Sequence, residues 1–268
     1  MIDEIICIGT SFTEGHGLNP THRQGDGKYI KDSAVVWYKK NKGIQIKSMT
    51  EVAWPSQLQN ISGIKTRNLG KCGSSIEYLI RNVEEIIEKE DVSNKFFILE
   101  YSSWGRSELW SSKYNQWVVA NWGPRDGKDS KKEGYASMMS TDYNFGTQLE
   151  TDDIVIYEKY LDNFFNEREY LIQRDRHFLN LLYKLKSKNI NYQIILLENP
   201  YLIELENNDL FNYKNVLDKS MWGYIENDVK LSITKITNGK IVDGHPSIEG
   251  HEHIANLIYT KLKSTKRL

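Results

Sequence analysis

Runs of apolar residues mark the positions where strands are expected. Four segments of strand length stand out, at Glu4–Gly9, Lys65–Gly70, Lys95–Tyr101 and Tyr192–Glu198, with a short fifth candidate at Lys240–Asp243. The second is the weakest match. In the others the apolar residues follow one another instead of alternating with polar ones, which is typical of strands in a sheet covered on both faces. The pattern therefore predicts a buried sheet.

Between the strand candidates, apolar residues recur at helical spacing. A capping-box pattern at Ser74-Ser75-Ile76-Glu77 opens one helix, a longer helix with Phe164 on its buried stripe is expected from about Ile154 to Leu185, and a last one from Ser247 to about Lys263. Strands that alternate with helices form right-handed βαβ units. The sequence thus predicts a single α/β domain over residues 1–268, with a doubly wound parallel sheet that binds ligands beyond the carboxyl ends of its strands.

Two regions do not fit this minimal scaffold, and we interpret both as insertions. The first, at about 17–56, contains seven Lys and Arg residues against two Asp between positions 23 and 47. Such a stretch is usually a solvated surface, although it would also favour an anionic substrate. The second, at about 102–150, holds four of the seven tryptophans. It suits a cap or lid with an aromatic core, or a platform for sugar rings or an acyl group.

Composition narrows the class of protein. The 268 residues are 39% hydrophobic and 26% charged, with a net charge of −1, which gives no general attraction to nucleic acid or membrane. Only Cys7 and Cys72 are present, which favours two reduced thiols in a cytosolic compartment. No signal peptide or membrane-spanning segment is recognisable. We therefore expect no nucleic-acid or membrane partner, and leave the oligomeric state open.

Three short segments carry candidate chemistry, and each lies where an apolar run stops. They are Gly9-Thr10-Ser11-Phe12, Asn68–Ser75 and Asp243-Gly244-His245-Pro246-Ser247. A serine hydroxyl becomes a nucleophile when a neighbouring base takes its proton, and an imidazole held by a carboxylate can be that base. Unpaired N–H groups at the start of the helix after Gly73 suit an oxyanion. The segments together indicate nucleophilic acyl transfer, with Ser11 attacking, His245 shuttling the proton and Asp243 orienting the ring.

Each of these residues also has a plainer interpretation. Ser11 begins a capping-box pattern of its own, Ser11-Phe12-Thr13-Glu14, so it could be a helix cap. Gly70 and Gly73 could serve only a tight turn, and Asp243 with His245 could be ordinary loop residues. His251 is expected to tie the last helix to the sheet. Two positions apart on a helix, His251 and His253 point in nearly opposite directions, so no metal is expected.

The three segments resemble, in order, the blocks of the SGNH (GDSL-type) hydrolase superfamily of esterases, lipases and deacetylases. Ser11 stands at the nucleophile's place, Gly73 at that of the oxyanion glycine, and Asp243-Gly244-His245-Pro246 resembles the last block. The resemblance implies a flavodoxin-like, three-layer αβα fold of the SGNH type. It also implies a serine esterase that acts without a cofactor, with the Ser11 N–H as a further oxyanion donor.

One block departs from the family pattern. The third block usually supplies an asparagine amide to the oxyanion hole, but here the strand leads into Ser102-Ser103-Trp104-Gly105-Arg106. By position Ser103 or Ser102 replaces the asparagine, while Arg106 and Trp104 are candidates for binding the substrate. The pattern is similar to a divergent subset of the family associated with bacteriophages.

The expected activity is hydrolysis of a small ester, with an O-acetyl group on a glycan or metabolite as the expected substrate. Two alternatives remain open, namely a weakly active or inactive binding or assembly module, such as a virion component, and an acyltransferase. The expected location is cytoplasmic or virion-associated.

Overall fold

The computed structural model describes residues 2–15, 49–102, 106–112, 115–121, 137–140, 156, 159–160, 163–197, 205, 208–211, 220–221, 236–237, 240–241 and 245–267. Four strands form a parallel sheet in the order β2-β1-β3-β7. They are β1 (Glu4–Gly9), β2 (Lys65–Gly70), β3 (Lys95–Tyr101) and β7 (Asn191–Leu196). This is the first part of the flavodoxin-like strand order. The predicted α/β fold with a doubly wound parallel sheet is confirmed.

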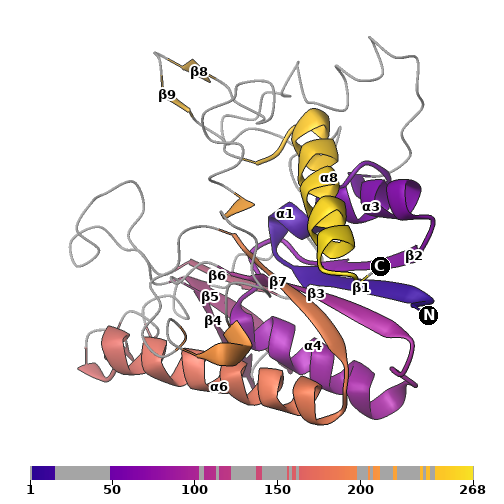
Figure 1. Cartoon of the computed structure of the whole chain (residues 1–268). Coiled ribbons are helices and arrows are strands. Elements are labelled where there is room, and N and C mark those ends of the chain that lie inside the picture. The colour runs from indigo at the N-terminus through magenta and orange to yellow at the C-terminus, as the bar shows by residue number, and fades with distance from the viewer. Residues whose placement is uncertain are drawn as a thin grey trace.

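Helices cover both faces of the sheet (Figure 1). On one face lie α3 (Trp54–Ser62) and α8 (Ile248–Ser264), and on the other lie α4 (Ile76–Lys89) and α6 (Glu167–Ser187). The side chains of β1 explain the three layers. Ile6 and Ile8 pack toward α4 and α6, while Ile5 and Cys7 pack toward α3 and α8. Because successive side chains of a strand point to opposite faces, both sets must be apolar, and the strand appears in the sequence as one continuous run.

Side-chain caps fix where three of the helices begin. The side chain of Ser75 accepts a hydrogen bond from the backbone N–H of Tyr78, and the side chain of Ser247 does the same for Gly250. Asn166 caps α6 by accepting from Glu169. Each cap satisfies one of the N–H groups that a helix start leaves unpaired. Ser75 and Ser247 are the last residues of two of the chemistry-bearing segments, so α4 and α8 begin directly after these segments.

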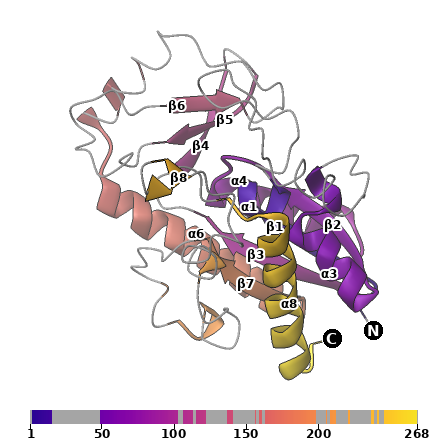
Figure 2. The same ribbon diagram turned by 90° about the horizontal axis from the view of Figure 1, so that it is seen from above.

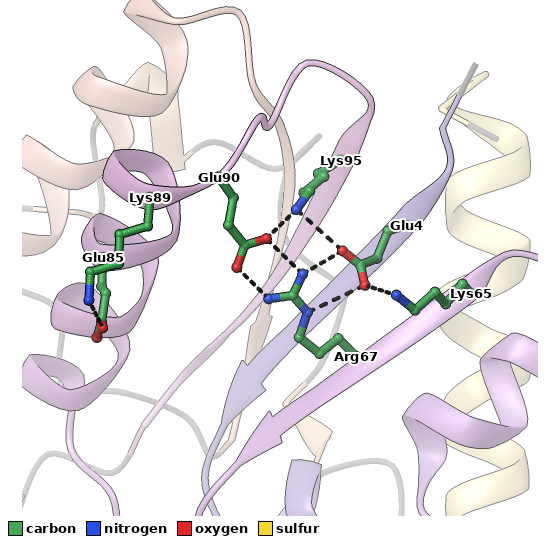
Figure 3. Close-up of polar contacts among 7 residues, drawn as sticks. All are labelled: Glu4, Lys65, Arg67, Glu85, Lys89, Glu90 and Lys95. Atoms are coloured by element: carbon green, nitrogen blue, oxygen red, sulfur yellow. Dashed lines mark hydrogen bonds and ion pairs between the residues drawn. The ribbon is translucent and has the colours of Figure 1, made fainter.

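Ionic contacts join the amino ends of the three neighbouring strands (Figure 3). The buried carboxylate of Glu4 contacts Lys65 at 2.9 Å and Arg67 at 2.6 Å, and Arg67 also contacts Glu90 at 2.7 Å. Lys95 pairs with both carboxylates. This amino-end cluster links the start of β1 to β2, to β3 and to the end of α4, at the edge of the sheet opposite Ser11.

A second, antiparallel sheet occupies part of the aromatic-rich region. It consists of β4 (Arg106–Ser111), β5 (Gln116–Asn121) and β6 (Ser137–Ser140). In two views it lies beyond the carboxyl ends of the parallel strands (Figures 1 and 2). Arg81 of α4 anchors it, because its guanidinium pairs with Glu108 at 3.1 Å and lies 5.3 Å from the ring centroid of Trp117.

Three expectations about the elements need correction. The candidate strand at Lys240–Asp243 does not join the parallel sheet, because β9 (Lys240–Ile241) pairs with β8 (Ile236–Thr237) in a separate antiparallel ladder. The long helix begins at Glu167 and not near Ile154, since Asn166 caps it there. Phe164, placed on its buried stripe, precedes the helix and is 81% exposed. Within the described residues, no helix is both long enough and apolar enough to cross a membrane.

Candidate active site

The turn that follows β1 presents Ser11 at the edge of the sheet. The short helix α1 (Ser11–Glu14) begins directly after the strand, with Thr10 as its N-cap. The capping-box interpretation of Ser11 is therefore wrong, because Ser11 is the first helical residue and not the cap. Its hydroxyl forms no hydrogen bond with any described residue, His245 included. Ser11 is thus placed at a strand end with a hydroxyl that the fold does not use.

Glu100, near the end of β3, holds this turn. Its carboxylate accepts hydrogen bonds from the backbone N–H groups of Thr10 at 3.0 Å and Thr13 at 3.1 Å, and from both threonine hydroxyls. A Cβ at Gly9 would come within 2.4 Å of the Glu100 carboxylate, so a glycine is needed where β1 ends. Sequence analysis missed Glu100. The signal was an acidic residue next to the apolar run Phe96–Leu99.

The last segment of the chain meets the first at this edge. The ring centroids of His245 and Phe12, the residue after Ser11, are 5.4 Å apart. His245 is half-buried, and the start of α8 follows it through the buried Pro246 and the cap Ser247. Asp243, predicted to orient the imidazole, lies outside the described residues. The structure therefore brings the predicted base beside the turn of the predicted nucleophile.

The second segment is tied to the end of β1. The backbone N–H of Lys71 donates to the Gly9 carbonyl at 2.9 Å, and the Ser74 hydroxyl donates to the same oxygen at 3.0 Å. Between them Gly73 has a φ of 78°, a left-handed conformation that favours glycine. Its N–H forms no hydrogen bond within the described part of the chain. The predicted oxyanion glycine thus lies in a loop fastened to the strand that leads into Ser11.

This loop also packs against α1. The amide of Asn68 donates to the Thr13 carbonyl at 2.8 Å, and the backbone N–H of Cys72 donates to the Glu14 carboxylate at 2.8 Å. At Gly70 a Cβ would come within 2.2 Å of the backbone nitrogen of Glu14. The glycine therefore permits a close approach of two backbones, and the plainer interpretation of Gly70 as a packing residue holds alongside its place in the motif.

The end of β3 offers the candidates for the missing asparagine. Ser102 is buried, and its hydroxyl has no hydrogen-bond partner in the described structure. It directly follows β3 and lies two residues beyond Glu100 in the chain. Ser103 and Trp104 lie outside the described residues. Of the two serines proposed from the sequence, Ser102 is the one that the structure describes.

The charge of Arg106 acts on Glu100, while the role of Arg106 in binding the substrate stays a prediction. Burial raises the pKa of Glu100, and the threonine hydrogen bonds and the charge of Arg106 oppose that rise. The backbone carbonyl of Arg106 accepts a hydrogen bond from the Tyr170 hydroxyl at 2.7 Å, which anchors the start of β4 to α6. The charge of the guanidinium thus helps to keep a proton off Glu100, the carboxylate that holds the turn of Ser11.

His251 has a structural role that differs from the expected one. Its Nδ1 accepts a hydrogen bond from the backbone N–H of Trp54 at 3.1 Å, so it ties α8 to α3 and not to the sheet. Burial, aided by the neighbouring His245, lowers the pKa of His251 to about 3. The ring is therefore neutral at physiological pH. The described residues contain no group of three His, Cys, Asp or Glu side chains that could hold a metal ion.

The site lies at the point where the strand order reverses. From β1 the chain passes to α1 and α3 on one face, while from β3 it passes through β4 to α6 on the other face. Chains that leave two neighbouring parallel strands in opposite directions open a crevice at their carboxyl ends, the usual ligand position in such folds. Ser11 follows β1 and Ser102 follows β3, so both candidate residues stand at this position.

No family model matches the sequence, and no curated protein matches it either. The chain is similar to several solved structures. One, from Desulfitobacterium hafniense, is described as a lipolytic protein of the G-D-S-L family; it is 13% identical, with a TM-score of 0.42 and coverage of 97% of this chain and 99% of that one. An acetylxylan esterase from Geobacillus stearothermophilus, solved as a catalytic mutant, is 15% identical, with a TM-score of 0.40 and coverage of 97% and 94%.

An acetyl xylan esterase from the rumen bacterium Butyrivibrio proteoclasticus is 15% identical, with a TM-score of 0.41, over 97% of this chain and 63% of that one. The G-D-S-L name is also the one that the sequence motifs suggested. Identities this low convey neither an activity nor a substrate to this chain.

Proposed function

We propose that this chain is a serine hydrolase acting on ester bonds, with Ser11 as nucleophile and His245 as general base. The observation that supports it is the contact of Phe12 with His245, because it brings the last segment of the chain to the turn that carries the serine. No residue in the described part of the chain forms a hydrogen bond with the Ser11 hydroxyl, which suits a group reserved for chemistry.

The proposed reaction has two steps. Ser11 Oγ attacks the ester carbonyl carbon while His245 takes the hydroxyl proton, and that proton then passes to the departing alcohol as its bond to carbon breaks. Water, activated by the same imidazole, releases the acid from the acyl-enzyme. Asp243 is proposed to orient the imidazole, as the sequence predicts. No cofactor takes part in either step.

The oxyanion is proposed to bind between the Ser11 and Gly73 N–H groups and a serine hydroxyl. The left-handed turn at Gly73 and the unpaired hydroxyl of Ser102 support this assignment. A buried hydroxyl without a partner costs free energy, and a developing negative charge would supply the acceptor that it lacks. Ser103 remains the alternative donor from the sequence, and Arg106 and Trp104 remain proposed contacts for the substrate.

The test compares wild type with Ser11→Ala for turnover of p-nitrophenyl acetate and for covalent labelling by a fluorophosphonate. We expect both to be lost in Ser11→Ala and kept in Ser264→Ala, a serine at the exposed end of α8. Equal turnover in wild type and Ser11→Ala would remove the proposal. Release of acetate from an acetylated glycan would extend it to the proposed substrate class.

A binding or assembly module is the second candidate. The absence of a hydrogen bond between Ser11 and His245 within the described residues favours it, as does the missing block III asparagine. It predicts that the fluorophosphonate leaves wild type unlabelled while a glycan still binds. An acyltransferase would instead be labelled, and would form new esters when sugars or alcohols are added, which mass spectrometry would detect.

A further inference from the structure

We propose that Glu100 is a positioning residue, whose carboxylate fixes the turn that carries Ser11. The inference rests on the proposed function, since it assigns to Glu100 the placement of that function's nucleophile. Neither the candidate triad nor the oxyanion donors include this residue.

The first argument is the way in which the carboxylate is shared between two threonines. One oxygen, Oε1, accepts from the N–H and the hydroxyl of Thr10, and the other, Oε2, accepts from the N–H and the hydroxyl of Thr13. Thr10 precedes Ser11 and Thr13 follows it by two residues. The two oxygens therefore hold the backbone on both sides of the serine, and a shift of Ser11 relative to the sheet would break these bonds.

The second argument concerns helix capping. The side chain of an N-cap residue such as Thr10 usually accepts a hydrogen bond from a free N–H of the first turn. In α1 no side chain of the helix's own N-cap does this. Glu100 instead accepts the Thr13 N–H from outside the helix. Because the carboxylate supplies this bond from outside, Ser11 is held at the first helical position by bonds in which its own hydroxyl takes no part.

The third argument is the burial of the group. Glu100, Thr10 and Thr13 are all fully buried, and a buried carboxylate is costly unless hydrogen bonds satisfy it. The preceding residues of β3 are apolar, so an apolar side chain at position 100 would maintain the sheet at lower cost. Arg106 supplies compensating positive charge, a role that it would have in addition to its proposed contact with the substrate.

The hydrogen bonds of Glu100 predict the effect of Glu100→Gln on activity. All four partners of the carboxylate are donors. An amide NH₂ would place a donor against the backbone N–H of Thr10 or Thr13, which cannot accept a hydrogen bond, so the turn must shift even though the side chain keeps its size. Displacing a reacting group by about 1 Å can lower the rate by about 100-fold. We expect kcat for p-nitrophenyl acetate and the rate of fluorophosphonate labelling to fall about 10- to 100-fold, with KM changed less than about threefold.

Two further comparisons separate positioning from stability. Glu4→Gln removes a buried, ion-paired carboxylate at the opposite end of the sheet (Figure 3). It should lower the melting temperature yet leave the labelling rate at the wild-type value. Thr13→Ser keeps the hydroxyl that bonds Glu100, while Thr13→Val removes it. We expect the serine variant to label near the wild-type rate and the valine variant to label more slowly.

Hydrogen–deuterium exchange of residues 10–15 supplies a readout that does not depend on activity. It should be faster in Glu100→Gln than in wild type and unchanged in Glu4→Gln. If wild type is labelled and Glu100→Gln is labelled as fast, with unchanged exchange, the inference is overturned. The inference is also overturned if Glu4→Gln, which is expected only to lose stability, is labelled as slowly as Glu100→Gln. If wild type is not labelled, the proposed function fails, and unchanged exchange in Glu100→Gln would show that the carboxylate does not hold the turn either.

Discussion

At the scale of single residues, the proposed site contains two serine hydroxyls that have no hydrogen-bond partner among the described residues. Around Ser11, the backbone is tied down by Glu100, Asn68 and the loop after β2, yet the serine hydroxyl takes no part in these bonds. The Ser102 hydroxyl is buried, and no described residue forms a hydrogen bond with it. Because most buried polar groups in proteins are hydrogen-bonded, such exceptions call for an explanation. The proposed oxyanion would supply one for Ser102.

Replacing Ser102 tests this explanation. Removing one oxyanion donor costs about 100-fold in kcat when nothing takes its place. We expect Ser102→Ala to lower kcat for p-nitrophenyl acetate by roughly that factor with little change in KM, since the hydroxyl would bind the transition state better than the substrate. Ser107→Ala, at another buried serine just inside β4, should keep wild-type kinetics. Wild-type kcat in Ser102→Ala would assign the donor to Ser103 or to the backbone.

At the scale of elements, the sequence was most informative where an element is decided by its own residues. The bounds of β1, β2 and β3 agree with the prediction, and α8 follows the cap Ser247 as expected. The start of α6 was placed too early, because the aromatic residues before Asn166 continue a helical pattern although Phe164 is exposed. Periodicity reports which residues could be buried, whereas the neighbours that bury them come from elsewhere in the chain.

The candidate site likewise contains some residues that local patterns reveal and one that depends on distant contacts. Ser11, Gly73 and His245 could be found because each belongs to a local pattern at a strand or helix end. Glu100 could not, because its role depends on contacts with Thr10 and Thr13, 90 and 87 residues away. A strand sequence shows that an acidic residue is present, but only the pairing of β3 with β1 shows what it faces.

Gly70→Ala tests the close approach of β2 to α1. The added Cβ would meet backbone atoms of Glu14 at 2.2 Å and Thr13 at 2.6 Å, which cannot move without the helix. We expect a loss of about 2–4 kcal/mol in the free energy of unfolding, measured by urea denaturation, and slower fluorophosphonate labelling of the folded protein. Gly63→Ala is the matched control, because no atom lies within 4 Å of its Cβ position and only its φ of 73° is strained. It should cost about 1 kcal/mol and leave labelling unchanged.

At the scale of the whole molecule, charged groups lie at both ends of the parallel strands and serve different purposes. The carboxyl ends of β1 and β3 hold the candidate site, with the buried Glu100 close to Ser11. The amino ends hold the ionic cluster of Glu4, Arg67 and Glu90, with Lys65 and Lys95 beside it (Figure 3). The amino-end cluster is too distant to take part in the chemistry, so its contribution is to stability. That contribution to stability should depend on pH. The contribution of His251, which is neutral inside the molecule, should depend on pH as well.

The two groups predict acid sensitivity in two ranges, which overlap only below about pH 4.5. His251 has a folded pKa of about 3, below the ordinary value of about 6.5, so the unfolded chain binds one more proton between these values. Stability should then fall as the pH drops from about 6.5, by up to about 1.4 kcal/mol per pH unit. For Glu4, burial opposes the charge, but Arg67 and Lys65 outweigh it and lower the pKa to about 2. Its stabilisation is present above about pH 4.5 and is lost as the pH falls toward 2.

Urea denaturation of wild type, His251→Gln and Arg67→Met between pH 7 and pH 2.5 separates the contributions of the two groups. His251→Gln should be less stable at pH 7, because its bond to the Trp54 N–H is changed, but it should lose little stability between pH 6.5 and 4.5. Arg67→Met should follow the wild-type slope in that range and become flatter below pH 4.5, because Glu4 has lost its strongest partner. Parallel curves for all three proteins would contradict both assignments, since the acid sensitivity would then have to arise from other groups.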